Sequence, residues 1–547
     1  MKTIHRIFSI LLVCMLAVSL VVPAMATEGN NNGNSETDIP VIPTTGEFSL
    51  TINNTRDGHT YELYMIFYGT YHQVESNTEP VLTDIKWGTG VKKYGTQDIT
   101  AGSEAGTVAA GLNDNNIVAF TKGLTLDEEE VFASENSSGG ICKFEKLPAG
   151  YYLVKDADGS LDNATSEAYT SYIVRVVGNA VASPKVNIPS LEKKTSDIND
   201  TTHIPGRYDN HVDSADFDIG DLVPFHIHID VGDNIENYEQ YTMVVVDTMS
   251  QGITFIEKLE QIQESDGLGD IAEADLITVT LENRVLTKGE HYTITQTDEN
   301  DNTIITFNFA NLKALGVTNS DTLTIDYYGR LNEHAVIGGT GNPNSAILYY
   351  SNDPYDVRDL SDPIDPSELG GKTPEDTVRI YTYQVTVHKE NASGQHLNGA
   401  TFKLYKYFYG DEDSWEEVQT IVGSNSHEFK FIGLDDGTYK LEEVTAPAGY
   451  NSIKPFEFKI EAEHTDTALT SLTAAPLHGS GQTFTPTNGK TDATSDGVLH
   501  TTVINQMGAT LPTTGGMGTT LIYAVGGILV LAAVVLLVTK KRMSDTE

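Results

Sequence analysis

The chain has 547 residues, 39% of them hydrophobic, and a formal net charge of −43. That length is enough for three or four ordinary domains, and the hydrophobic share argues against a wholly disordered acidic chain. The acidic balance excludes nucleic acid as a partner, because little positive charge is present to neutralise phosphates. Two cysteines are too few for a disulfide scaffold or a cysteine-based zinc module.

The first 26 residues have the pattern of a secretory signal peptide. A basic start precedes an apolar run over residues 7–22, which ends in Pro23-Ala24-Met25-Ala26. The alternative is a membrane anchor, but the run is short for a span and the small-x-small exit favours cleavage after Ala26. Cleavage removes Cys14, so the exported chain keeps Cys142 alone and forms no internal disulfide.

The body of the chain, from Glu47 onward, reads as mainly β. Short β-branched and aromatic runs alternate with Gly, Asn and Asp turns, which is typical of stacked β-sandwiches. Composition breaks near Pro184–Pro189 and Pro363–Pro374 divide this body into three parts. The expected organisation is a signal peptide, a disordered leader, three β domains and a C-terminal tail: 1–26, 27–45, 46–185, 186–372, 373–510 and 511–547.

Two sets of side chains raise the question of metal binding. The acidic loop 353–368 offers carboxylates for calcium, but a solvated linker is the better interpretation. His226 and His228 share a strand face without an apparent third ligand, which favours a solvated face. We therefore expect no metal and no cofactor.

The C-terminal tail combines three features in a fixed order. The pentapeptide Leu511-Pro512-Thr513-Thr514-Gly515 is followed by an apolar stretch, 521–538, long enough to span a bilayer, and then by a basic cluster, 540–542. Together they resemble the cell-wall sorting signal of Gram-positive surface proteins. The resemblance implies that a sortase cuts between Thr514 and Gly515 and passes the threonyl group to an amine. A near-copy at 42–46 lacks the apolar and basic parts, and we interpret it as a coincidental exposed linker.

The third β part places a lysine, an acid and an asparagine on faces that period-two geometry turns inward. The apolar residues that share these faces are Tyr439 and Leu441 with Glu443, Val385 and Val387 with Lys389, and Val503 with Asn505. A buried carboxyl or amine is costly unless it is paired or neutral. The plain alternative is a buried ion pair with a nearby asparagine.

Residues 439–450 resemble the E-box of Gram-positive pilins, with Val444 where the family usually has Thr. The surrounding stretch resembles a Cna-B-type domain, an immunoglobulin-like β-sandwich. The resemblance implies that the Lys389 amine attacks the Asn505 side-chain carbonyl, that ammonia leaves, and that Glu443 assists the proton transfers. The product is an isopeptide bond between the first and last strands of the domain.

The middle part resembles the second domain of backbone pilins in the segments 218–225 and 246–255. Strand parity puts Lys193, Asp247 and Asn352 on inward faces. The family pattern implies an isopeptide between Lys193 and Asn352, with Asp247 as the assisting acid. Two alternatives stay open, Lys194 for the amine and Asn344 for the amide, since a bulge would change the parity.

The first part ends with a strand like that of the E-box, but Lys155 stands near the place of the acid, so we expect no isopeptide there. Pro184-Lys185-Val186-Asn187 partly matches the motif that supplies the receiving amine in backbone pilins. Lys185 is therefore the expected polymerisation lysine, and an ordinary linker lysine is the alternative.

These features together resemble a backbone pilin, a structural subunit polymerised head to tail on a Gram-positive cell surface. The implied partners are sortases, neighbouring and minor pilin subunits and peptidoglycan, with host ligands left open. The first rival is a monomeric wall-anchored adhesin built from the same domains. The second is a secreted enzyme, which the lack of a catalytic motif disfavours.

Overall fold

The computed structural model describes most of the chain. The residues described are 41–73, 80–113, 116–161, 168–183, 188–202, 210–233, 235–263, 271–354, 364–409, 414–508 and 518–544. The predicted signal peptide, Lys185 and the sorting pentapeptide 511–515 lie outside these ranges, as does most of the acidic loop 353–368.

The described residues divide into two compact units. The second unit takes Tyr383–Ala462, the chain from Ser471 onward and the short segment Asp200–Thr202, and the first unit takes the remainder, including Glu463–Thr470. The first unit holds separate hydrophobic cores for the first and middle domains expected from the sequence.

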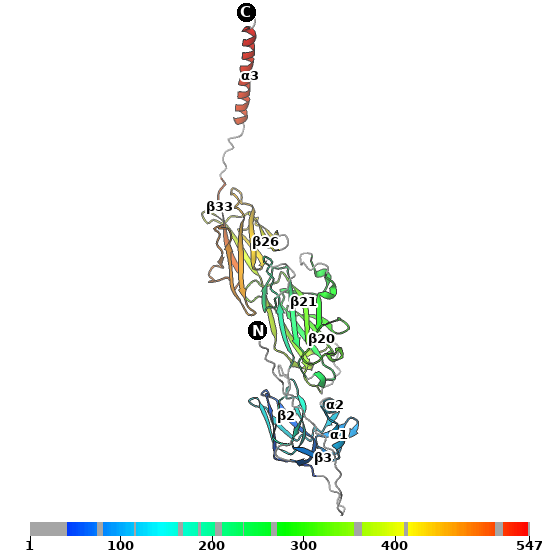
Figure 1. Ribbon diagram of the computed structural model, residues 1–547. Coiled ribbons are helices and arrows are strands. Elements are labelled where there is room, and N and C mark those ends of the chain that lie inside the picture. Colours follow the sequence, from blue (N-terminus) through cyan, green and yellow to red (C-terminus); the bar gives the residue numbers. More distant parts are fainter. Residues whose placement is uncertain are drawn as a thin grey trace, which may run out of the picture. The chain divides into compact units, whose positions relative to one another are not determined.

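The first domain is built from two main sheets and a small third one, drawn in blue to cyan in Figure 1. The three-stranded sheet has the order β11-β1-β8, the five-stranded sheet the order β10-β9-β2-β3 with β7 on β2, and the small sheet the order β5-β4-β6. Their bounds are β1 Phe48–Asn53, β2 Thr60–His72, β3 Val81–Trp87, β4 Val91–Tyr94, β5 Gln97–Asp98, β6 Leu124–Leu126, β7 Ala133–Asn136, β8 Ile141–Leu147, β9 Gly150–Asp156, β10 Ser171–Val176 and β11 Ala180–Ala182. Two short helices, α1 (Gly106–Gly111) and α2 (Ile117–Lys122), accompany the small sheet.

Strand β2 explains why this domain needs two cores. Its run of buried residues is nearly continuous, because successive side chains enter opposite cores. Leu63 and Met65 pack with the three-stranded sheet, whereas Tyr64 and Ile66 pack with α1, α2 and the small sheet. Ile42, in the near-copy of the sorting pentapeptide, packs against the first of these cores, so this segment is part of the fold rather than a fully exposed linker.

The middle domain consists of two larger sheets. One has the order β12-β14-β21-β17-β18 with β16 on β21, and the other the order β13-β24-β22-β15-β20-β19 with β23 on β22. Their bounds are β12 Ser190–Thr195, β13 Ser214–Asp216, β14 Leu222–Asp230, β15 Met243–Met249, β16 Ile253–Ile256, β17 Ile277–Leu281, β18 Arg284–Leu286, β19 Thr293–Glu299, β20 Asn302–Phe309, β21 Thr322–Leu331, β22 Asn342–Ser351, β23 Gly370–Lys372 and β24 Asp376–Tyr381. Because β24 pairs with β22 and β13, the domain ends at Thr382 rather than at residue 372 as predicted.

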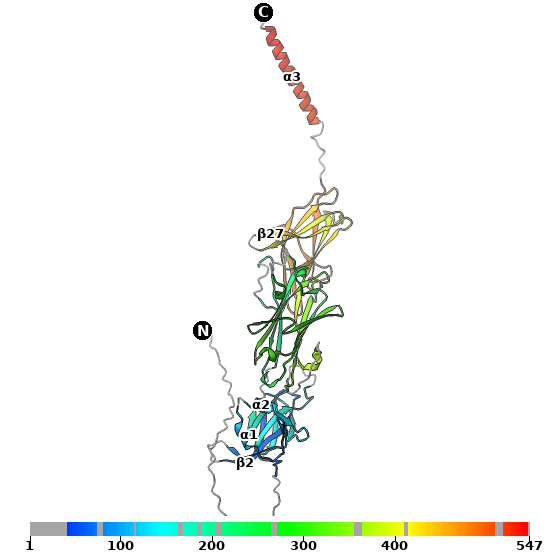
Figure 2. The ribbon, with the colours of Figure 1, turned by 90° about the vertical axis from the view of Figure 1, so that its right-hand side faces the viewer.

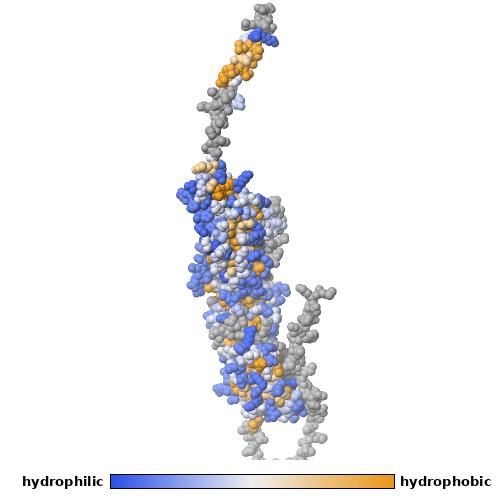
Figure 3. All heavy atoms as spheres, turned by 90° about the vertical axis from the view of Figure 1, so that its left-hand side faces the viewer, coloured by the Kyte–Doolittle hydropathy of each residue, from blue (hydrophilic) through white to orange (hydrophobic). Residues whose placement is uncertain are grey.

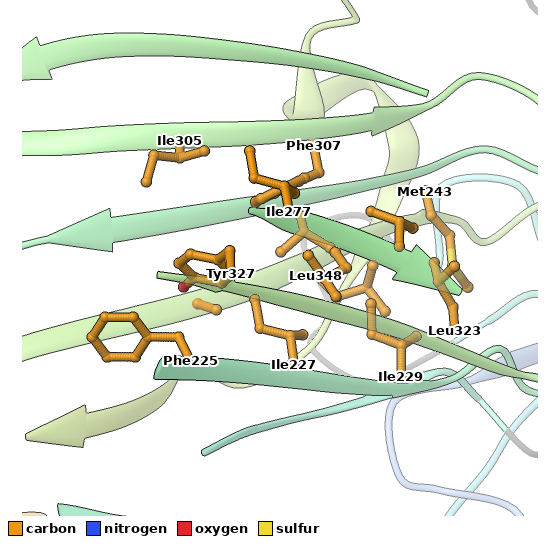
Figure 4. Close-up of a cluster of buried hydrophobic side chains, with 14 of the residues drawn as sticks. Phe225, Ile227, Ile229, Met243, Ile277, Ile305, Phe307, Leu323, Tyr327 and Leu348 are labelled. Carbon is orange, nitrogen blue, oxygen red and sulfur yellow. The ribbon is translucent and has the colours of Figure 1, made fainter. Parts of the chain in front are cut away.

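The inner faces of these two sheets form one apolar core, shown in close-up in Figure 4. Buried and more exposed residues alternate along β21 and along β14 from Phe225 onward, as expected for sheets with one solvated face. The rings of Phe225 and Tyr327 lie side by side at one end of the cluster, with centroids 5.5 Å apart (Figure 4). The hydroxyl of Tyr327 is thus carried into a largely apolar region.

The C-terminal domain is a sandwich of two sheets, seen in yellow and orange in Figure 2. Their orders are β28-β25-β33-β32 and β27-β26-β29-β30-β31. The bounds are β25 Tyr383–Asn391, β26 Thr401–Phe408, β27 Ser414–Val422, β28 Glu428–Leu434, β29 Gly437–Thr445, β30 Phe456–His464, β31 Leu469–Pro476, β32 Thr485–Pro486 and β33 Val498–Asn505. First strand β25 and last strand β33 run parallel in direct pairing.

The tail forms one helix, α3 (Gly518–Ser544). Its stretch Tyr523–Lys541 has a mean hydropathy of 2.2 and is long and apolar enough to cross a membrane. Figure 3 shows its apolar side chains in orange, followed by basic residues in blue. The helix fits the predicted transmembrane tail, and the predicted fold class, tandem all-β sandwiches, is confirmed.

Candidate isopeptide sites

Lys389 on β25, Glu443 on β29 and Asn505 on β33 meet in the core of the C-terminal domain. The parallel register places Lys389 beside Val503, two residues before Asn505. The Asn505 Nδ2 group donates a hydrogen bond to Glu443 Oε1 at 2.9 Å, and Lys389 Nζ lies 3.8 Å from the same oxygen. Lys389 Nζ also donates to the Val503 carbonyl at 2.9 Å. The structure therefore brings together all three residues that parity placed inward.

Burial controls the chemistry of this site. The exposed fractions of Lys389, Glu443 and Asn505 are 0%, 4% and 1%. Burial lowers the pKa of Lys389 to about 8, although the nearby Glu443 carboxylate acts in the opposite direction. A larger share of the amine is then neutral and nucleophilic at physiological pH than for a free lysine. Glu443 holds the amide nitrogen that would depart as ammonia, and Asn505 Oδ1 has no hydrogen-bond partner among the described residues.

The second site lies in the core of the middle domain. Lys193 Nζ contacts Asp247 Oδ2 and donates to the Tyr327 hydroxyl at 2.6 Å. The Tyr327 hydroxyl donates to Asp247 Oδ2 at 2.5 Å and accepts from Asn344 Nδ2 at 3.2 Å. All four side chains are 1% exposed or less. Burial lowers the pKa of Lys193 and raises that of Asp247, so both shifts favour the neutral amine and the protonated acid.

The asparagine of this site is Asn344, not the predicted Asn352. The register of β15 and β22 sets Met249 opposite Asn344, two residues from Asp247, whereas Asn352 lies beyond the end of β22. Eight residues of strand separate the two asparagines, which is roughly 26 Å. Asn352 packs against Gly370, and its Nδ2 makes no hydrogen bond within the described part of the chain. The alternative amine, Lys194, points outward and pairs with Glu192 and Asp213.

Sequence reasoning missed Tyr327. It occupies an inward position on β21, where residues alternate strictly between buried and half-buried. A buried tyrosine hydroxyl needs a polar partner, so an inward tyrosine on this strand could have been predicted to contact the buried polar set. Here it connects the amine, the acid and the amide of the middle site, and burial beside Asp247 raises its pKa well above the ordinary value.

Comparisons with known proteins point to pilins. The SpaA family model, described as a prealbumin-like fold domain, matches residues 383–473. The trypsin-resistant surface T6 protein of Streptococcus pyogenes serotype M6 is 24% identical over 554 residues, covering 90% of this chain and 94% of that protein. The predicted resemblance to Gram-positive major pilins is confirmed.

Solved structures of major pilins are also similar to this chain. The T6 backbone pilin of serotype M6 Streptococcus pyogenes is 18% identical, covers 77% of this chain and 84% of its own, and has a TM-score of 0.49. The major pilin SpaD of Corynebacterium diphtheriae is 16% identical, with 85% and 98% covered and a TM-score of 0.45.

The first domain has an acid but no lysine at the equivalent place. Asp156, fully buried on β9, accepts hydrogen bonds from the Thr170 N–H at 2.7 Å and the Thr170 hydroxyl at 2.9 Å. Its other oxygen lies 2.7 Å from His59 Nδ1. Lys155, which the sequence placed near the acid position, points outward and pairs with Asp158. The acid position thus belongs to Asp156, one residue further along the strand.

Proposed function

We propose that this chain is the structural backbone subunit of a covalent, sortase-assembled pilus on a Gram-positive cell. The observation that carries the proposal is the buried Lys389–Glu443–Asn505 set, whose lysine and acid lie inside the segment matched by the SpaA model. It supports a shaft protein because a permanent bond in the core protects a fold that must bear tension and resist proteases. In this proposal the chain is a sortase substrate, a role that the sorting-signal pattern at 511–542 supports.

The isopeptide bond between Lys389 and Asn505, the C-terminal staple, forms in two stages. The neutral Lys389 amine adds to the Asn505 side-chain carbonyl carbon, and Glu443, whose Oε1 lies 3.8 Å from Nζ, takes a proton from the amine. Glu443 then transfers a proton to Nδ2, which it already holds at 2.9 Å, and ammonia leaves. The product is an amide between Lys389 Nζ and Asn505 Cγ, with one ammonia lost.

The isopeptide bond between Lys193 and Asn344, the middle staple, uses Lys193 as the nucleophile, Asp247 as the acid and the Asn344 side chain as the amide. Tyr327 bridges Asp247 and Asn344, so it is placed to carry a proton from the acid toward the leaving nitrogen. Burial of Lys193 and Asp247 favours the proton distribution that the reaction needs.

Subunits are then joined head to tail. A sortase cleaves after Thr514 and transfers the threonyl group to Lys185 of the next copy, and a final transfer attaches the shaft to peptidoglycan. Export, sortase action and this choice of lysine rest on the sorting-signal and Pro184-Lys185 patterns. The apolar helix α3 supports a transient membrane intermediate at the cell surface.

The polymer is tested in cells that express the chain with its pilus sortase. Wild-type cells should give an SDS-resistant ladder, which disappears in Lys185→Ala and persists in the control Lys143→Ala, an exposed lysine of β8. A single band from wild-type cells would instead support a monomeric wall-anchored adhesin. Replacing the cleavage residue, Thr514→Ala, should release unanchored protein into the medium.

The staples are tested by mass. Exported protein should be lighter than its sequence by one ammonia for each Lys–Asn bond. Asn344→Ala should restore one ammonia mass, and Asn352→Ala should restore none. The opposite result would return the middle bond to Asn352.

A further inference from the structure

A third buried lysine lies in the C-terminal domain, away from the staple. Lys406 on β26 is 0% exposed and points inward with Phe402 and Leu404. Its Nζ lies 2.7 Å from Asp200 Oδ2 and 2.7 Å from Asp435 Oδ1. The Asp200 side chain is 14% exposed and the Asp435 side chain 1% exposed, so an amine and two carboxyls share one nearly dry site.

Asp200 is held by hydrogen bonds of the segment Asp200–Thr202, which packs with the C-terminal domain. The Asp200 carbonyl accepts from the Tyr409 N–H at 2.8 Å. The Thr201 hydroxyl donates to the Tyr407 carbonyl at 3.2 Å and accepts from the Thr438 N–H at 3.0 Å. The carboxyl is therefore positioned against the amine before any reaction, which is the main requirement for an intramolecular step.

The surroundings of this amine match those of Lys193. Phe225 and Tyr327 flank Lys193 Nζ at 5.3 and 5.2 Å, and Phe408 and Tyr439 flank Lys406 Nζ at 5.5 and 5.9 Å. In each site a tyrosine hydroxyl donates to the acid.

The acid beside Lys406 is Asp435, and the Tyr439 hydroxyl donates to its Oδ1 at 2.9 Å. Amine, acid, tyrosine and a second carbonyl-bearing side chain thus occur together in both places. The carbonyl-bearing side chain is an asparagine at one site and an aspartate, Asp200, at the other.

We propose that Lys406 and Asp200 form an isopeptide bond, with Asp435 as the assisting acid. Two carboxylates compete for one cation here, so passing a proton from the ammonium to a carboxyl leaves a neutral amine without creating a new isolated charge. The amine adds to Asp200 Cγ, and Asp435 takes a proton from Nζ and delivers it to the departing hydroxyl. The Nζ–Cγ bond forms, the Cγ–Oδ bond breaks and one water leaves.

This bond would differ from the two staples in what it connects. Asp200 follows β12 and precedes β13, both strands of the middle-domain sheets, whereas Lys406 belongs to the C-terminal domain. Lys406 follows Asp200 by 206 residues, so the bond would close a loop that contains the chain from β13 to β26. If load enters at Lys185, a consequence that rests on the proposed function, tension could pass from Asp200 to Lys406 without extending the chain between them.

Peptide mass spectrometry of the full exported chain tests the bond independently of polymerisation. Trypsin should yield a branched peptide joining residues 195–207 to residues 404–430, lighter than the sum of its two parts by one water, because an acylated Lys406 is not cleaved. Fragmentation should place the branch on Asp200. Separate peptides, with cleavage after Lys406, would overturn the proposal and leave an ion pair.

Variants sharpen the assignment. Asp200→Ala should abolish the branched peptide, and the control Asp197→Ala, in the same tryptic peptide, should retain it. Asp200→Asn should give a branched product of the same mass as the wild type, because ammonia leaves in place of water. Asp435→Asn should reduce the branched fraction at least tenfold while the ammonia losses of the two staples persist, and an unchanged fraction would remove Asp435 from the mechanism.

Discussion

The first and C-terminal domains pair their strands in the same way but differ at the residues that could be stapled. In each, the first strand pairs antiparallel with one strand and parallel with the last: β1 with β8 and β11, and β25 with β28 and β33. The acid of each domain stands six residues after a glycine that opens the next strand, Asp156 after Gly150 and Glu443 after Gly437. The acid position is thus common to both domains.

The two domains differ at the position that supplies the amine. Leu50 pairs with Phe144 as Val385 pairs with Phe431, and four residues beyond these lie Asn54 in the first domain and Lys389 in the C-terminal domain. In the first domain, which has no lysine at this position, the buried Asp156 carboxyl contacts His59 instead. A buried carboxyl therefore needs a partner in either domain, and only a lysine with an amide in reach makes that partnership covalent.

The largest expected effect comes from removing the acid of the stapled domain. Glu443→Ala should prevent the Lys389–Asn505 bond, restore one ammonia mass and lower the free energy of unfolding. A cross-link that closes a loop of about 100 residues is worth about 5 kcal/mol by the chain-entropy argument developed for disulfides. Urea unfolding followed by Trp415 of β27, in a Trp87→Phe background, measures this domain alone.

The neighbouring acid provides the control. Glu442 is half-buried on the opposite face of β29 and accepts a hydroxyl hydrogen bond from Tyr405 at 3.0 Å, so Glu442→Ala should keep the isopeptide bond and most of the stability. Equal losses in the two variants would mean that Glu443 acts through packing rather than through bond formation.

The first domain should show a smaller effect at its non-covalent pair. Among the described residues, His59→Ala leaves the buried Asp156 with the two Thr170 hydrogen bonds, and we expect the free energy of unfolding to fall by about 3 kcal/mol, the low end for breaking a buried pair. Trp87 fluorescence in a Trp415→Phe background reports on this domain. His72→Ala, at an exposed position of β2, should change stability by less than about 0.5 kcal/mol. Indistinguishable variants would show that the pair contributes nothing to stability.

Period-two parity was enough to place Lys389, Glu443 and Asn505 in one core, because each lies on a strand with clear apolar neighbours. Parity could not choose between Asn344 and Asn352, since both lie on the same face of the chain and only the pairing of β22 with β15 separates them. His59 and Tyr327 were missed for a related reason: each meets its acid across strands that are distant in sequence. Asp200 is a stronger case, because it packs in the same unit as Lys406 although 206 residues separate the two in sequence.

The pH dependence of the unlinked C-terminal domain should be a further difference between the domains. Asn505→Ala leaves Lys389 as a free buried amine whose pKa is lowered to about 8 by burial. In the unfolded chain the amine titrates near its usual value of about 10. Between these values the unfolded state binds more protons, so stability should rise with pH from about 8 to about 10.

The urea midpoint reported by Trp415 should therefore increase across that window, and the midpoint reported by Trp87 should not follow it. A flat Trp415 profile would show that the amine remains charged in the folded domain.

The smallest effect is expected from placing a lysine in the first domain at the position of Lys389. Asn54→Lys should form no bond, because β11, the last described strand of this domain, reads Ala-Val-Ala and offers no side-chain amide. Asn54 also has a φ of 57°, in the left-handed region that asparagine tolerates better than lysine, so the substitution should cost about 1 kcal/mol. Intact mass equal to the sequence mass of this domain, together with a small fall in the Trp87 midpoint, is the expected result. A lost water or ammonia traced to residue 54 would show instead that an acid and an amine suffice, and that the amide of the last strand does not decide which domain is stapled.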